Sequence, residues 1–417
     1  MKRPILIFIC LIGLVWPGCE KNPAHSNNNS YKQKQIDWPS LADSPWPMWG
    51  HDPQWTYRSQ YVGPSGCDTL HVYRHTSGIM WESGLLIGMD DNVYYTTSWD
   101  TAFNSSLGKK TGVITKLDSE YQIIWQMAVS YESIYESGNS ISVVPVLSTN
   151  GVFVFGSDRS LTRIAKDGSI ENRIIINQNC PKWALQIDKE GNLFWANNGA
   201  SSYTADGELR WENLERSFTF IGPFSPQGDQ IYISSRDSLF ALGANNGNIL
   251  WSRYGKGSIS VNCDGKIYTL TDSTLLALES DGSLDWEISL LVNDAQYFSG
   301  STNIAIGPEG NLYFDISKPY SDDSPLIISV SPKGNIRWVY QPGVSINAWI
   351  IADAAGNIYT YLTDGRIFSL DSNGLLRWST QIFNDYVGEL QIAINSQGKL
   401  LISAVRSQEL QGIIEIY

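Results

Sequence analysis

The chain has 417 residues, a formal net charge of −13 and a pI near 4.8. An acidic surface repels phosphate backbones, so the composition argues against nucleic-acid binding. Charged residues make up only 17% of the chain, whereas its 16 Trp, 21 Tyr and 36 Gly favour short strands and tight turns over helices.

The N-terminus has the pattern of an export signal. Two basic residues precede the apolar residues 5–15, a stretch shorter than the roughly 20 residues that cross a bilayer. Gly18-Cys19 then resembles the end of a lipobox, so we expect residues 1–18 to be removed and Cys19 to be lipidated. The two residues before Gly18 depart from the usual lipobox, and ordinary cleavage to a secreted or periplasmic protein is the alternative.

Residues 19–44 are predicted to form a flexible tether between the membrane and the folded domain, because their first half is rich in Asn, Ser, Lys and Gln. The folded domain is then expected to span residues 45–417. It contains Cys67, Cys180 and Cys263 but no CxxC pair, which argues against a zinc or thioredoxin-like site. The sequence leaves open whether two of these cysteines form a disulfide.

A repeat of about 40 residues, the length of one four-stranded propeller blade, predicts the architecture. Each unit has a Gly-x-aliphatic-aromatic strand, a short apolar strand, and a turn whose Gly is followed four residues later by Trp. The Gly and Trp pairs are Gly207 with Trp211, Gly247 with Trp251, Gly282 with Trp286, Gly334 with Trp338, and Gly374 with Trp378. Two copies are degraded: Tyr121 takes the Gly position before Trp125, and Asn172 takes the Trp position after Gly168.

The first of these strands recurs eight times, from Val93-Tyr94 to Leu400-Leu401. We therefore predict an all-β domain that is a single eight-bladed propeller. The eighth unit ends at residues 413–416 without its Trp strand. Residues 69–73 have the right phase to supply the missing strand, and pairing them with the C-terminal strand would remove two exposed sheet edges.

The repeated Trp residues are predicted to be structural. A Trp that fills the space between two sheets buries roughly 200 Å2, and its removal costs roughly 3–5 kcal/mol. The residues concerned are Trp125, Trp211, Trp251, Trp286, Trp338 and Trp378.

The units resemble the pyrroloquinoline-quinone-type (PQQ-like) β-propeller repeat family. The segment from Ala241 to Trp251 keeps the Ala, Gly and Trp of that family's docking pattern at the same spacing, although it departs at the acidic and Thr positions. Residues 46–59 are similar to the lead-in of exported members. The closest functional type is the outer-membrane assembly propeller lipoprotein, which implies a scaffold that binds envelope proteins. The dehydrogenases of the family carry an adjacent Cys pair that is missing here, so the resemblance implies that PQQ is not bound.

We predict no catalytic, cofactor-binding or metal-binding residue. The four histidines, at positions 25, 51, 71 and 75, all precede the first complete unit, which argues against a Ser-His-Asp triad or a His-rich metal site in the blades. Most acidic residues fall in turns, where turn chemistry explains them. Asp322-Asp323 is interpreted as a solvated loop, with a calcium site as the weaker alternative.

Two long units carry inserts, at residues 98–112 and 316–325. Loops carry recognition in many scaffolds, and exposed aromatic residues act as binding anchors. Trp99, Phe103 and Tyr320 are therefore predicted to lie in binding loops, with loop drift that serves no partner as the alternative.

These features favour a non-catalytic, monomeric lipoprotein of the bacterial envelope, on the outer membrane or cell surface. It would contact the membrane through its lipid anchor only and would bind envelope proteins or glycans through its loop faces. The alternative is an enzyme, either a degenerate quinoprotein dehydrogenase or a carboxylate-based glycan-processing propeller. The centre of the ring discriminates between them: converging acids or arginines would favour the enzyme, and a plug of apolar and hydroxyl side chains would favour the scaffold.

Overall fold

A computed structural model describes the chain from residue 32 onward, and residues 32–417 form one compact unit. Within it the described residues are 32–67, 70–74, 84–97, 111–131, 144–156, 159–176, 184–255, 257–300, 303–318, 324–346, 349–382, 391–407 and 410–417. In these ranges no helix has the length and hydropathy that crossing a membrane requires.

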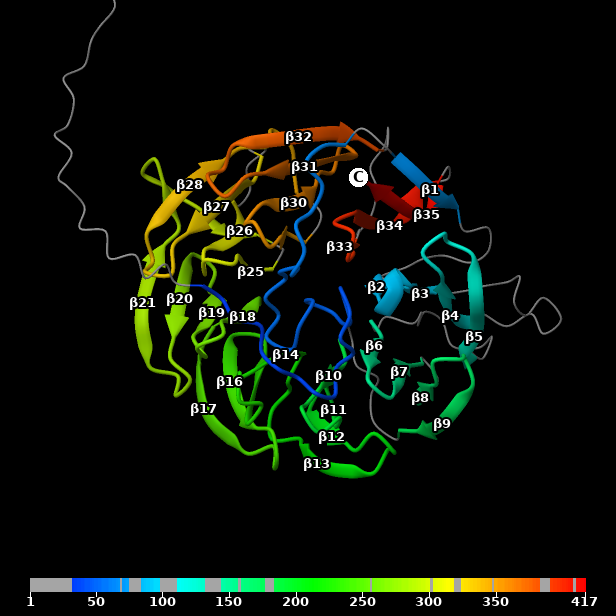
Figure 1. The fold of residues 1–417 in the computed structure, drawn as a ribbon. Coiled ribbons are helices and arrows are strands. Elements are labelled where there is room, and N and C mark those ends of the chain that lie inside the picture. Colours follow the sequence, from blue (N-terminus) through cyan, green and yellow to red (C-terminus); the bar gives the residue numbers. More distant parts are fainter. Residues whose placement is uncertain are drawn as a thin grey trace, which may run out of the picture. The chain divides into compact units, whose positions relative to one another are not determined.

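The compact unit is an eight-bladed β-propeller, in which eight antiparallel sheets stand around one axis (Figure 1). The first four blades are β2 (Leu86–Ile87), β3 (Val93–Thr97), β4 (Thr111–Leu117) and β5 (Ile123–Tyr131); β6 (Val146–Ser148), β7 (Gly151–Phe155), β8 (Ser160–Ile164) and β9 (Ile170–Ile175); β10 (Gln186–Ile187), β11 (Leu193–Ala196), β12 (Ala200–Tyr203) and β13 (Leu209–Asn213); and β14 (Phe220–Phe224), β15 (Gln230–Ser234), β16 (Ser238–Gly243) and β17 (Ile249–Tyr254).

The remaining blades are β18 (Ile259–Val261), β19 (Ile267–Leu270), β20 (Thr274–Leu278) and β21 (Leu284–Ser289); β25 (Ala305–Ile306), β26 (Leu312–Ser317), β27 (Leu326–Val330) and β28 (Ile336–Tyr340), with β24 (Phe298–Ser299) added beside β26; β29 (Ile351–Ala352), β30 (Ile358–Tyr361), β31 (Arg366–Leu370) and β32 (Leu376–Gln381); and β33 (Gln391–Ile394), β34 (Leu400–Ser407), β35 (Leu410–Ile416) and β1 (Leu70–Arg74). A small hairpin, β22 (Leu291–Val292) with β23 (Ala295–Gln296), and a one-turn 3-10 helix η1 (Met89–Asp91) lie outside the blades.

Side-chain burial follows the position of each strand in its blade. In β15 the side chains of Ile231, Tyr232 and Ile233 are all fully buried, because the second strand lies between two neighbouring blades. Along the outermost strand β17 half-buried and exposed residues alternate, because only one of its faces is covered. The eight-bladed all-β fold predicted from the repeat is therefore confirmed.

The ring is closed by strands from the two ends of the domain. Strand β1 pairs antiparallel with β35, and Val72 lies opposite Ile414. This is the pairing expected from the missing strand of the eighth unit. Because β35 then lies between β34 and β1, neither of its edges is left unpaired. The pairing also links the two ends of the domain by backbone hydrogen bonds.

Each repeated Trp joins its blade to the next one. The Nε1–H of Trp251 donates a hydrogen bond to the carbonyl of Ser280 in the following blade, at 2.9 Å. The Cα of Gly282 lies so close to the indole that an added Cβ would come within 2.7 Å of it. The same bond recurs from Trp125 to Lys166, Trp211 to Ala244, Trp286 to Pro332, and Trp338 to Ser372.

Three seams between blades depart from this arrangement, and two of them retain a comparable hydrogen bond. In the blade without a Trp, the Asn172 side-chain amide donates to the carbonyl of Asp206 at 3.1 Å and so replaces the indole N–H. Trp378 has no following Trp-type turn in sequence, and it donates to the carbonyl of Pro64 at 3.1 Å instead. The segment before β1 therefore takes part in the seam between the last two blades.

Candidate ligand-binding site

The middle of the ring is occupied by the chain itself. The lead-in segment, residues 46–59, runs across the centre of the blades, where it is drawn in blue in Figure 1. Trp46 and Ile87 exchange two backbone hydrogen bonds at 3.0 Å. Further innermost strands donate backbone N–H groups to the segment, from Leu147 to Pro47, Phe224 to Pro53, Val261 to Gln54, Ile306 to Thr56, and Ala352 to Tyr57. The lead-in segment thus binds the innermost strands of six blades.

A tight turn shapes the lead-in segment. The Asp52 carboxylate accepts a hydrogen bond from the backbone N–H of Thr56 at 3.0 Å and a second one from its hydroxyl. Nδ1 of His51 lies 3.3 Å from the same carboxylate. Burial raises the pKa of Asp52, but the hydrogen bonds from His51 and Thr56 and the charge of His51 outweigh it, so the pKa is lowered overall. The turn therefore contains an ionised carboxylate that its neighbours already satisfy.

Above this segment lies a cavity with a volume of about 270 Å3. We call it the aromatic cup, after its five aromatic lining residues, which are Trp49, Trp55, Tyr57, Phe220 and Trp349. Trp349 meets Trp49 edge to face, with ring centroids 4.6 Å apart. It also stacks on Tyr57 at 5.7 Å, with 4° between the ring planes. These contacts hold the aromatic wall in one arrangement before any ligand arrives.

The cup opens at one particular edge of the blades. Phe220 begins β14 and lies opposite Ser234, which ends β15. The cup therefore opens where the first strand of a blade begins and the second ends. In an up-and-down blade the connection from second to third strand leaves at this same edge. The two inserts follow Thr97, the end of β3, and Ser317, the end of β26, so both inserts start from the edge at which the cup opens.

The predicted loop residues Trp99, Phe103 and Tyr320 lie outside the described residues, as do Asp322-Asp323 and Cys19. What the structure adds is the cup itself, which the sequence analysis did not identify. Its aromatic floor was visible only as part of the lead-in run, and nothing local in sequence places Phe220 or Trp349 beside it. The useful signal would have been the density of Trp and Tyr in residues 46–59.

The polar groups of the cup are uncharged. Among the described residues that line it, Thr219, Ser234, Ser258 and Asn303 carry hydroxyl or amide groups, and none carries a charge. The Asn303 amide is buried and bonds the backbone of Ile350 in both directions, at 2.8 and 2.9 Å. Asn303 therefore joins two blades at the wall of the cup.

Comparison with known proteins agrees with this architecture. A family model described as "Outer membrane protein assembly factor BamB" matches residues 196–341. The chain is also similar in structure to a europium-containing methanol dehydrogenase, with a TM-score of 0.63 and 10% identity over 86% of this chain and 89% of that one. The chain has the fold of the PQQ-like β-propellers, and its residues 196–341 match that repeat family.

Two quinohemoprotein alcohol dehydrogenases resemble this PQQ-like propeller to the same degree. The enzyme from Comamonas testosteroni has a TM-score of 0.65 and 11% identity over 92% of this chain and 82% of that one. The enzyme from Pseudomonas putida HK5 has a TM-score of 0.62 and 11% identity over 88% and 78%. No curated protein sequence matches the chain. At such low identity the structural likeness establishes the fold and not the activity.

Among the residues that the structure describes, acidic, basic and His side chains do not converge on the cup. In the part of the chain that the structure describes, no three His, Cys, Asp or Glu side chains are grouped to hold a metal ion. His51 is paired with Asp52, and His71 stacks on Tyr121 with ring centroids 5.6 Å apart. Cys67 and Cys263 are half-buried and are not joined to each other by a disulfide, and Cys180 lies outside the described residues.

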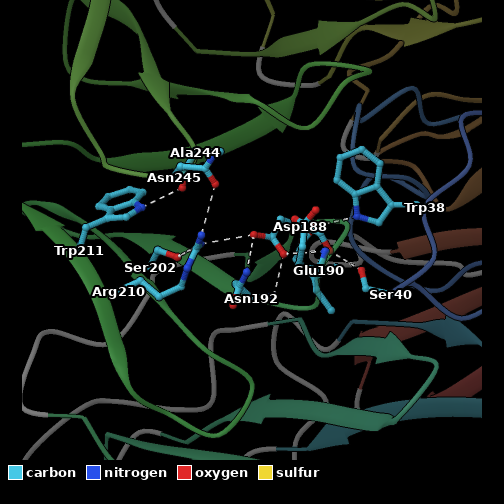
Figure 2. Close-up of polar contacts among 11 residues, drawn as sticks. Trp38, Ser40, Asp188, Glu190, Asn192, Ser202, Arg210, Trp211, Ala244 and Asn245 are labelled. Carbon is cyan, nitrogen blue, oxygen red and sulfur yellow. Dashed lines mark hydrogen bonds and ion pairs between the residues drawn. The ribbon is translucent and has the colours of Figure 1, made fainter.

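A buried polar network does exist, at the opposite edge of the blades (Figure 2). Asp188 follows β10 and accepts hydrogen bonds from the backbone and side-chain amides of Asn192, at 2.7 and 2.8 Å. Arg210 approaches the same carboxylate at 3.4 Å and also donates to Ser202 and Asn245. Burial raises the pKa of Asp188, although Asn192 and Arg210 oppose that shift. The network joins two blades at the end of β10, where Asp188 follows that strand.

The same network extends to the N-terminal segment and corrects the predicted boundary of the domain. Trp38 is buried, and its Nε1–H donates to the carbonyl of Ile187 at 2.9 Å. The Ser40 hydroxyl donates to the carbonyl of Asp188 (Figure 2). Residues 32–44 belong to the predicted flexible tether, but in the structure this part packs on the propeller. The composition concealed this contact because the apolar residues that pack on the propeller, Ile36, Trp38, Leu41 and Ala42, are interspersed with polar ones.

Proposed function

We propose that this chain is a non-catalytic envelope protein that binds its partner at the edge of the propeller where the aromatic cup opens. The observation that carries the proposal is the lining of the cup, which is aromatic and hydroxyl-bearing and, within the described residues, uncharged. Such a surface offers no general acid, general base or metal ligand. It does offer what ligand pockets use, namely apolar walls with a few fixed polar groups.

Lipid anchorage at Cys19 is part of the proposal. Its support is the apolar stretch of residues 5–15 followed by Gly18-Cys19. The partners we propose are proteins or glycans of the bacterial envelope. The support is the match of residues 196–341 to a family described as an outer-membrane assembly factor.

We also propose that the chain acts without PQQ. A quinone cofactor that works with a metal ion needs oxygen ligands for that metal and charged groups that tune the quinone. The lining residues that the structure describes supply neither, and the lead-in segment occupies the centre of the ring. These residues do not fit such a cofactor. The alternative of a dehydrogenase is supported by likeness of fold alone.

Affinity capture from envelope extract tests the proposal. The full chain is compared with two variants in the same blade, Phe220→Ala at the cup and Tyr254→Ala on the outermost strand. Both aromatic side chains are exposed, at 43% and 56%, so the pair is matched for chemistry and accessibility. We expect the cup variant to lose the captured component and the outer variant to retain it. Recovery of a quinone and dehydrogenase activity with the purified chain would overturn the proposal.

A further inference from the structure

We propose that the aromatic cup binds a neutral sugar ring, the end unit of an envelope glycan. This inference rests on the proposed binding role of the same face and names the class of ligand. Four features of the cup support it: the aromatic wall, the backbone conformation of its floor, an unpartnered indole N–H, and the absence of charge from its described lining.

The wall presents flat apolar rings to the cavity. Trp49, Trp55 and Trp349 are half-buried, and Phe220 is 43% exposed, so each retains surface that a ligand can cover. A sugar ring has one face made of C–H groups and an edge made of hydroxyls. Its C–H face matches an aromatic ring, and large rigid rings give contact area with little loss of conformational entropy.

The floor of the cup is held in an unusual backbone conformation. Trp55 has φ +54° and Tyr57 has φ +51°, in the left-handed region that bulky residues rarely adopt. Backbone hydrogen bonds from Trp55 to Asp52 and from Tyr57 to Gly50, both 2.9 Å, maintain it. Residues held in such conformations concentrate at ligand-binding sites. Here the conformation places the rings of Trp55 and Tyr57 in the lining of the same cavity.

One polar group of the floor has no acceptor. The Nε1–H of Trp55 is buried, and the described part of the chain provides no hydrogen-bond partner for it. Leaving a buried donor unpaired is unfavourable, because the group has lost its hydration without gaining a hydrogen bond in return. A ligand that carries hydroxyl or ring oxygens can supply the acceptor after a small movement of the indole. The hydroxyls of Thr219 and Ser234 lie in the same lining.

The absence of charged side chains from the described lining limits the classes of ligand that the cup can bind. No Lys or Arg is among the described lining residues, which disfavours phosphate and carboxylate ligands. The described part of the lining holds no carboxylate either, and the neighbouring Asp52 is already satisfied by His51 and Thr56, which disfavours cations. A purely apolar side chain from a partner protein would leave the hydroxyl groups without a role. The cavity of about 270 Å3 lies just below the range of drug-sized pockets, so it is matched to one ring and not to a long chain.

The test is binding of the purified full chain to an array of neutral, anionic and cationic saccharides, followed by titration of tryptophan fluorescence with the best ligand. We expect saturable binding restricted to neutral sugars. Phe220→Ala and Trp349→Ala should each weaken it at least tenfold, and Tyr254→Ala should leave it unchanged. N-acetylglucosamine and glucuronate serve as the neutral and anionic probes, and the anionic one should bind at least tenfold more weakly.

The outcomes separate this inference from the proposed function. If no neutral sugar binds while Phe220→Ala still abolishes capture from envelope extract, the ligand is a protein side chain and the sugar proposal fails alone. If neutral sugars bind equally well to the Phe220→Ala and Tyr254→Ala variants, the site is elsewhere and the proposal also fails. If both the array and the capture experiment are negative, the proposed function fails with it.

Discussion

The contact between Trp251 and Gly282 provides the sharpest test of how the blades are joined. A Cβ at residue 282 would meet the indole at 2.7 Å, and the residue has φ +82°. Gly343 is a matched control, because it has φ +87° and no atom within 4 Å of an added Cβ. Both glycines therefore impose the same backbone restriction, and only Gly282 adds a steric contact with the neighbouring blade.

The expected magnitudes differ accordingly. A left-handed conformation costs a non-glycine residue about 1–2 kcal/mol, so Gly343→Ala should lower the free energy of unfolding by about that amount. Overpacking a close contact adds roughly 1–3 kcal/mol, so Gly282→Ala should lose roughly 2–5 kcal/mol in total. Urea unfolding followed by far-UV circular dichroism measures both, provided that the dependence on urea concentration is the same in all variants.

A double variant isolates the contact. In a Trp251→Ala background the indole is gone, and Gly282→Ala should then cost no more than Gly343→Ala does. The expected coupling energy between residues 251 and 282 is roughly 1–3 kcal/mol, within the range measured for residues in contact. Equal losses for Gly282→Ala in both backgrounds would refute the reasoning, since the cost would then come from the backbone alone.

Three further predictions concern single side chains. Trp338→Phe removes the indole bond to Ser372 and should destabilise the fold by roughly 0.5–1.5 kcal/mol plus a small packing loss; an unchanged urea midpoint would contradict it. Burial raises the pKa of Glu415, but its hydrogen bonds, led by the one with Lys399, outweigh it and lower the pKa overall. Its contribution is thus present above the ordinary pKa of Glu and is lost as the pH falls, so Glu415→Gln should flatten the acid side of the stability profile measured by thermal unfolding. Trp38→Ala should cost roughly 3–5 kcal/mol, whereas a residue in a free tether would leave the melting temperature unchanged.

The seam between the first and last blades shows what a single sequence can and cannot reveal. The pattern marks Tyr121 as a degraded copy, because a large residue stands where other turns have Gly. In the structure His71 of β1 pairs with Glu415 of β35, just as Trp251 pairs with Ala241 in the fourth blade. His71 therefore occupies the position that Trp has in most of the other blades. The Tyr121 ring stacks on His71, so large and small partners have been exchanged across this seam. From the sequence only the change at Tyr121 could be identified, since His71 belongs to a different blade.

The candidate site was less accessible to sequence than the fold. The residues of the aromatic cup come from the lead-in segment and from several blades, and no spacing along the chain connects Trp55 with Phe220 or Trp349. The sequence was enough to say that the residues at the centre of the ring would discriminate an enzyme from a scaffold. The sequence did not show which residues occupy that centre. The lead-in segment is held there by backbone hydrogen bonds, and these do not depend on the identity of the side chains.

By itself the sequence determined the number of blades, the strand order within each blade, and the strand that completes the last one. Those features follow from local signals, namely Gly at turns with positive φ, buried aliphatic runs and a Trp at a fixed distance, which repeat because every blade has the same environment. The tertiary structure alone decided where the lead-in segment lies, that Trp38 belongs to the folded domain, and that five distant aromatic residues form one cup. These depend on contacts between residues far apart in the chain, and such contacts are set by the packing of the ring as a whole.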